Sequence, residues 1–266
     1  MTTRLGTNYV HITVTGGERV VSANGWPDHK PGEFPRPGNP NSISYQTYNF
    51  HLPLHPQIAA QPTPIAHSLF GVAINGVPFD PGTAEFWNRD PRSGWNYEAK
   101  SGFINLGLDE NNAHVQPTGA YHYHGLPIGL VQNLGGDGSK MILLGYAADG
   151  FPIYSGYGYV RANDASSGLK KMRSSYQLKH GMRPGGPGGA YDGKFTADFE
   201  YVKGSGDLDE CNGRFGVTPE YSQGTYHYYI TDEFPWISRN WRGTPDSSFF
   251  KHPFGGRAPG LAQRRP

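Results

Sequence analysis

The sequence predicts an all-β protein, an antiparallel β-sandwich or barrel-like body with long Gly/Pro-rich loops, little helix and two related β units. Three observations support this. The 266 residues include 38 Gly and 23 Pro, which favour turns and loops. Aromatic residues make up 14% of the chain and would be costly to leave in water, which argues against disorder. Short alternating runs of aromatic and β-branched residues lie between turn signals, as in strands.

The N-terminal region is predicted to form a hairpin. Tyr9 to Val14 alternates as a strand does, Gly16-Gly17 favours a tight turn, and Arg19 to Ala23 returns. A further strand is expected within Ser42 to Leu52, after which proline-rich sequence interrupts regular pairing.

A turn motif of the form Asn/Asp-Gly-apolar-Pro occurs three times, beginning at Asn24, Asn75 and Asp149. Asn-Gly and Asp-Gly favour hairpin turns in which both central residues take positive φ. The matches around the last two copies are longer, and they predict related β units at about 67–131 and 141–232.

These units are expected to pack as one domain over residues 1–252. The Arg-rich sequence at 253–266 is predicted to be a flexible tail.

One stretch, Gly119 to Pro127, contains the tetrad Tyr121-His122-Tyr123-His124. In a strand, alternate side chains share a face, so the two His lie on one face and the two Tyr on the other. Two residues of strand span roughly 6.6 Å, so both imidazoles can reach one metal ion. In a helix the same pair would point about 200° apart.

A catalytic metal site typically has three protein ligands. His227 is the first choice for the third, because Tyr226-His227-Tyr228-Tyr229 resembles the tetrad; His114, eight residues before the tetrad, is the second choice. Imidazole ligands suit copper, zinc, iron or nickel, and a site of His and Tyr alone favours copper or iron, of which copper is the leading ion. The alternative is that these His stack on Tyr and bind backbone groups.

The acidic segment from Asp207 to Gly213 is a second candidate site. Its oxygen ligands could hold calcium, through Asp207 and Asp209. Alternatively Asp209 or Glu210 could act as a catalytic base beside the metal, or the carboxylates could cap local turns. Cys211, the single cysteine, is expected to be a buried, inert thiol.

Composition and motifs exclude several classes of function. With a formal net charge of +1 and no long basic block, nucleic acid is not an expected partner. No apolar run has the length of a membrane span, and no signal peptide is recognised at the N-terminus. The Gly-x-Ser-x-Gly elbow and the His-Glu-x-x-His helix motif are both missing.

The chain resembles the YHYH-domain family, which is named for this tetrad. The similarity covers most of the chain and includes Asn24-Gly25-Trp26-Pro27-Asp28-His29, Asn39-Pro40-Asn41, Asn75-Gly76-Val77-Pro78-Phe79-Asp80, Asn112-Ala113-His114, Asp149-Gly150-Phe151-Pro152-Ile153 and Asp209-Glu210-Cys211-Asn212-Gly213. The resemblance implies no particular activity. It does imply export, so an extracellular or periplasmic location is expected.

Two functional hypotheses follow. The first is a metal-binding β protein, with copper the favoured ion, that could be an oxidoreductase or a hydrolase acting on a small molecule. The second is a non-catalytic extracellular module that binds polysaccharide or assembles with copies of itself. That module would use exposed aromatic side chains, among them Trp26, Trp87, Trp95, Trp236 and Trp241.

Overall fold

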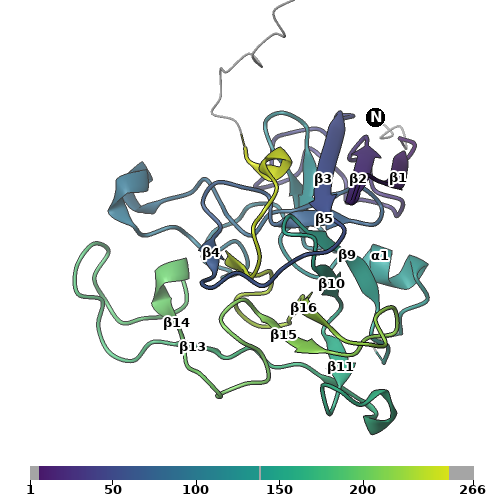
Figure 1. Ribbon diagram of the computed structural model, residues 1–266. Coiled ribbons are helices and arrows are strands. Elements are labelled where there is room, and N and C mark those ends of the chain that lie inside the picture. Colours follow the sequence, from purple (N-terminus) through teal and green to yellow (C-terminus); the bar gives the residue numbers. More distant parts are fainter. Residues whose placement is uncertain (1–5, 138, 252–266) are drawn as a thin grey trace, which may run out of the picture.

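The structure, a computed structural model, describes residues 6–137 and 139–251 (Figure 1). It is mostly β, as predicted, and its largest element is an eight-stranded mixed sheet of order β15-β16-β10-β9-β5-β6-β8-β7. These strands are β5 (Gly71–Ala73), β6 (Pro78–Phe79), β7 (Ala113–Val115), β8 (Tyr121–Tyr123), β9 (Leu143–Ala147), β10 (Pro152–Tyr154), β15 (Gly213–Gly216) and β16 (Thr225–Tyr229). The predicted flexible tail at 253–266 lies outside the described residues.

A three-stranded antiparallel sheet is formed by β1 (Val10–Thr15), β2 (Glu18–Ala23) and β3 (Tyr48–Pro53). The predicted N-terminal hairpin is therefore confirmed. The expected strand within 42–52 begins only at Tyr48, because the preceding residues bond to loops, for example Ser44 N–H to the Gly119 carbonyl.

The two sheets share one hydrophobic core, which gives a sandwich-like arrangement without a closed barrel in the described part of the chain. Buried side chains of the smaller sheet, such as Phe50 and Leu52, cluster with Val72 and Phe79 of the larger sheet. The predicted Tyr face of the tetrad also lies in this core, since Tyr121 and Tyr123 are fully buried. Burial of these rings fixes which face of β8 the histidines occupy.

The remaining elements are short and lie between or beside the sheets. They are β4 (Thr63–Pro64), β11 (Tyr157–Tyr159), β12 (Leu169–Lys171), β13 (Tyr176–Leu178), β14 (Phe199–Tyr201), β17 (Asn240–Trp241), the helix α1 (Ile128–Asn133), and the 3₁₀ turns η1 (Trp87–Arg89), η2 (Pro91–Ser93), η3 (Ala165–Ser167), η4 (Thr196–Asp198) and η5 (Ser247–Phe249). Across residues 6–137 and 139–251, the helices are too short for any of them to cross a membrane.

The two halves of the large sheet have the same topology. In the first half, the hairpin β5-β6 turns at Asn75-Gly76, β6 pairs parallel with β8, and β8 pairs antiparallel with β7. In the second half, β9-β10 turns at Asp149-Gly150, β10 pairs parallel with β16, and β16 pairs antiparallel with β15. The halves meet where β5 pairs antiparallel with β9, as two related units would. In Figure 1, β5, β9, β10, β16 and β15 follow one another down the view.

Candidate metal centre

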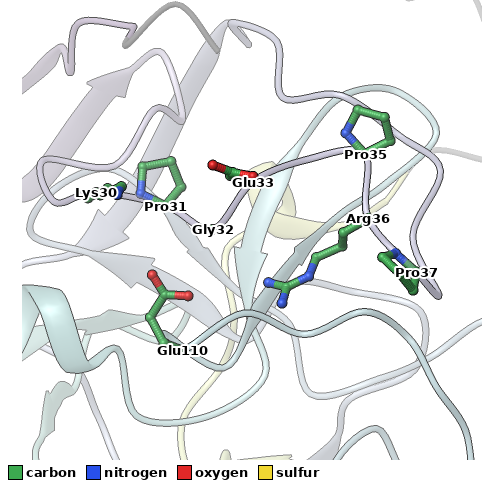
Figure 2. Close-up of a pocket in the computed structure, with 8 residues that line it drawn as sticks. All are labelled: Lys30, Pro31, Gly32, Glu33, Pro35, Arg36, Pro37 and Glu110. Atoms are coloured by element: carbon green, nitrogen blue, oxygen red, sulfur yellow. The ribbon is translucent and has the colours of Figure 1, made fainter. Parts of the chain in front are cut away.

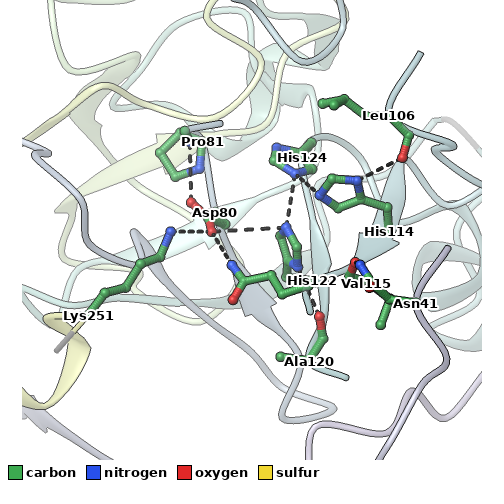
Figure 3. Close-up of polar contacts among 12 residues, drawn as sticks. Asn41, Asp80, Pro81, Leu106, His114, Val115, Ala120, His122, His124 and Lys251 are labelled. Atoms are coloured by element: carbon green, nitrogen blue, oxygen red, sulfur yellow. Dashed lines mark hydrogen bonds and ion pairs between the residues drawn. The ribbon is translucent and has the colours of Figure 1, made fainter. Parts of the chain in front are cut away.

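Three histidines of the first half converge at one edge of the large sheet. His122 Nε2 lies 3.0 Å from His124 Nε2, and His124 Nε2 lies 3.1 Å from His114 Nε2. One ligand atom from each ring can be chosen so that all three lie within 4.8 Å of one another. Figure 3 shows the three rings facing one another. His114 and His122 come from β7 and β8, and His124 follows β8 directly.

Strand pairing places these rings together. His114 and His122 are direct cross-strand partners in the antiparallel pair β7-β8, so their side chains emerge side by side on the same face. His124 is two residues beyond His122 and shares that face. Its backbone N–H donates to the Asn112 carbonyl at 2.7 Å, which keeps the chain in register past the end of β8.

A turn centred on Asp109 positions both strands. Its Oδ1 accepts hydrogen bonds from the backbone N–H groups of Asn111 and Ala113, which fixes the start of β7. Its Oδ2 accepts from the Tyr121 hydroxyl at 2.6 Å, on the opposite face of β8 from the histidines. The tyrosines of the tetrad thus anchor the strand that carries the imidazoles.

Backbone carbonyls set the tautomer of two rings. His114 Nδ1 lies 2.9 Å from the Leu106 carbonyl, and His122 Nδ1 lies 3.1 Å from the Ala120 carbonyl. Each Nδ1 must donate to its carbonyl, so in the neutral ring each Nε2 carries a lone pair. A histidine that binds a metal through Nε2 commonly has its Nδ1 held in this way.

Burial keeps the three imidazoles neutral. It lowers the pKa of His114, lowers the pKa of His122 to about 3 and lowers that of His124 well below its usual range. The neighbouring rings lower the pKa of His122 and His124 further, because each charge disfavours the next. Neutral imidazole is the form that binds metal ions.

The arrangement fits a metal ion better than it fits a set of mutually hydrogen-bonded rings. The lone pairs on His114 Nε2 and His122 Nε2 both face His124 Nε2, which can donate at most one proton. His124 Nδ1 is also buried without a hydrogen-bond partner. Nitrogen ligands of a tetrahedral ion with bonds of ~2.05 Å lie roughly 3.3 Å apart, close to the two spacings here.

One carboxylate adjoins the three rings. Asp80 is buried, and its Oδ2 lies 4.0 Å from His122 Nε2. The same oxygen accepts from Gln116 Nε2 at 3.2 Å and from Lys251 Nζ at 2.5 Å (Figure 3). Sequence reasoning missed Asp80 as a site residue, although it ends the motif that begins at Asn75. It follows β6, the strand paired in parallel with β8.

The structure does not bring His227, the first choice for the third ligand, to this group. His227 lies on β16, separated from β8 by β10, β9, β5 and β6, which is roughly 24 Å along the sheet at ~4.8 Å per strand. Its Nε2 lies 2.8 Å from the Tyr229 hydroxyl instead. His114, the second choice, supplies the third ring.

His227 occupies the position of His122 within its own unit. It pairs across the strands with Arg214, as His122 pairs with His114, and its Nδ1 lies 3.0 Å from the Thr225 carbonyl two residues back. The second unit therefore has Arg214, His227 and Tyr229 where the first has three histidines. The sequence similarity between β8 and β16 arises because the two strands occupy equivalent positions in the two halves of one sheet. They do not face each other.

The acidic segment caps a turn, as its structural alternative predicted. Asp209 Oδ1 accepts from the backbone N–H groups of Cys211 and Gly213 and from the Tyr226 hydroxyl, which repeats the role of Asp109. Asp207 pairs instead with Lys170 Nζ at 2.6 Å. These contacts hold Asp207 in an ion pair and Asp209 in a turn of the second half of the sheet, and Asp209 does not belong to the three-histidine group.

Within residues 6–137 and 139–251, the structure contains one group of three or more side chains that could hold a metal ion, and this group is the three histidines. Glu210 belongs to no such group, so the idea that it acts beside the metal has no geometric support. Cys211 is buried, and burial raises its thiol pKa far above the usual value, in keeping with an inert thiol.

Two of the pockets on the described surface bear on the search for a site. One, of about 440 Å³, lies under the proline-rich loop of residues 30–37 and includes Glu110 (Figure 2). Its lining contains no histidine. The other, of about 270 Å³, includes His122 and therefore leads to the three-histidine group. The smaller pocket is the relevant one for chemistry at the metal centre.

The tetrad, its flanking turns and the paired units match one family model, described as YHYH protein, over residues 49–243. The chain belongs to the YHYH family. No curated protein and no solved structure matches the chain. The matched span contains all three histidines and Asp80, so the candidate metal centre lies inside the YHYH region. Family membership by itself assigns no reaction.

Proposed function

We propose that the protein binds one transition-metal ion through His114, His122 and His124. The observation that carries this proposal is the convergence of three neutral imidazoles, two buried and one half-buried, two of which have Nδ1 held by a backbone carbonyl. Three protein ligands leave at least one position open for water or for a small molecule, as in catalytic metal sites.

Copper is the ion we favour. For a given set of nitrogen ligands, Cu²⁺ binds more tightly than the other divalent ions of the first transition row, and zinc is the main competitor. The single cysteine is buried elsewhere and supplies no thiolate to the group. Direct competition between Cu²⁺ and Zn²⁺ for the metal-free protein tests this choice.

Asp80 gives the site a group that can accept a proton. We propose that Asp80 would accept a proton from a water or a small molecule held at the open position of the metal ion. Gln116 and Lys251 hold its carboxylate in place. Such a centre could support oxidation or hydrolysis. Asp80→Asn is expected to retain the metal, because the three rings supply the ligands, whereas loss of metal in this variant would make Asp80 a ligand.

The alternative module, which binds polysaccharide through exposed tryptophans, has less support. Trp26 and Trp241 are buried, and Trp87, Trp95 and Trp236 are half-buried, so they do not form the exposed row of rings that stacking on a sugar chain requires.

Metal content of the purified protein tests the main proposal. We expect about one equivalent in the native protein and close to none in the double variant His122→Ala/His124→Ala. The matched control is His227→Ala, which removes a buried histidine from the equivalent place in the second unit and should keep the metal. A folded native protein that takes up no copper or zinc would refute the proposal.

Removal of the metal should also lower stability. An ion present at 100 to 1,000 times its Kd stabilises the folded state by about 3–4 kcal/mol, so a chelator should lower the free energy of unfolding by that amount. We further propose an extracellular or periplasmic location, which localisation of the tagged full-length protein would test.

A further inference from the structure

The residues that line the pocket beside His122 indicate the shape and charge of the molecule that it would bind. Its walls are largely apolar and aromatic, and its lining includes Tyr48, Phe50, Leu69 and Phe249. Three of these rings form a stack: Tyr48 and Phe50 have centroids 5.0 Å apart, and Phe50 and Phe249 have centroids 4.4 Å apart. Phe50 and Phe249 are buried, and Tyr48, at the end of the stack, is the half-buried ring against which a flat, apolar ligand can pack.

The size of the pocket limits the ligand to about one ring. A dry cavity of about 150 Å³ in a protein core accommodates benzene. The pocket here has about 270 Å³, enough for one ring and a small polar group but not for a polysaccharide chain.

The charges favour an anionic polar group. Lys251 is the charged side chain of the lining, which has no carboxylate, and the other polar members are Gln46, Gln116, Thr118 and Ser248. Asp80, behind the lining, balances the charge of Lys251. The histidines are neutral, so a divalent metal ion would leave the site with a net charge of about +2.

We propose that this pocket binds a small single-ring aromatic carboxylate, with the ring against the half-buried Tyr48 and the carboxylate towards Lys251 and the candidate metal centre. This inference rests on the proposed metal function, because the metal ion supplies the excess positive charge. It extends that proposal by naming the chemical class of the small molecule.

Benzoate is the probe, and calorimetric titration measures its binding to the metal-loaded and metal-free protein. Leu69→Trp should fill the pocket and abolish binding, and Lys251→Ala should weaken binding at least tenfold, while both variants retain the metal. Lys30→Ala, in the other pocket, is the matched control and should bind as the native protein does. Benzamide, a neutral molecule of the same shape, should bind at least tenfold more weakly.

The two proposals fail in different ways. If the protein holds its metal but benzoate does not bind, or binds equally well to Leu69→Trp, the ligand proposal is wrong and the metal proposal stands. If the protein takes up no metal and binds no benzoate, both are wrong. If benzoate binds equally well with and without metal but depends on Lys251, the pocket assignment stands and the contribution of the metal charge to binding is wrong. Equal affinity for benzoate and benzamide would overturn the choice of an anion.

Discussion

Because the two halves of the sheet are equivalent, we predict that a second metal site can be engineered around His227. The double variant Arg214→His/Tyr229→His would give the second unit the three histidines of the first. Arg214 pairs with His227 in the same register as His114 pairs with His122, and both His122 and His227 face the carbonyl two residues back. We expect the variant to bind one additional equivalent of metal.

The structure gives the cost of these substitutions. They remove the contact between Tyr229 Oη and His227 Nε2 at 2.8 Å and the hydrogen bond from Arg214 Nη2 to the Tyr159 carbonyl at 2.6 Å. Each is worth ~1 kcal/mol, and the smaller side chain at the buried position 229 adds ~1 kcal/mol. The metal-free variant should therefore be about 3 kcal/mol less stable, and an ion at 100 times its Kd should restore about 2.7 kcal/mol.

The assay counts only the new site if the variant also carries His122→Ala/His124→Ala. Metal content and the temperature of unfolding, each measured with and without added copper or zinc, report the result. The control Arg214→Ala/Tyr229→Phe changes the same two positions without adding ligands. The reasoning would be refuted by a variant that is folded by circular dichroism but holds no more metal than this control and gains no thermal stability from the ion.

Further predictions concern groups outside the metal centre. Burial raises the pKa of Asp149, which accepts from the Tyr228 hydroxyl, to about 6. The folded state then holds more protons than the unfolded state between pH 4 and 6, so this residue's contribution to stability should fall by about 3 kcal/mol as pH rises through that window. Urea unfolding should show this loss in the native protein but not in Asp149→Asn. Asp198→Ala removes the buried one of the two carboxylates that pair with the guanidinium of Arg183, while Asp192 remains, and should cost about 3 kcal/mol, also measured by urea unfolding. Cys211→Ala should retain the full metal content, and a loss of metal would contradict the assignment of this thiol as inert.

Local sequence patterns determined much of this protein. The alternation of Tyr and His fixed a strand with a buried Tyr face and a face that carries both histidines, because strand side chains alternate with a period of two. The Asn-Gly and Asp-Gly motifs marked the hairpins of both halves of the sheet. The expected turn type was wrong, because only the glycines, Gly76 and Gly150, take positive φ, each at the last position of its turn. The resemblance between the Tyr121 and Tyr226 strands corresponds to equivalent strands, β8 and β16, in the two halves of the large sheet. These features depend on residues close together in the chain.

Tertiary structure decided which side chains complete the site. Whether the strand of His227 faces that of His122 depends on strand order, and four strands separate them in one sheet. His114 reaches the site through its cross-strand pairing with His122. Asp80 lies 42 residues before His122 in the chain, and Lys251 lies 129 residues after it. Side-chain spacing along a strand is set by backbone geometry, but the order of strands is set by burial of the whole core. The sequence therefore determined the chelating pair, and only the fold determined its partners.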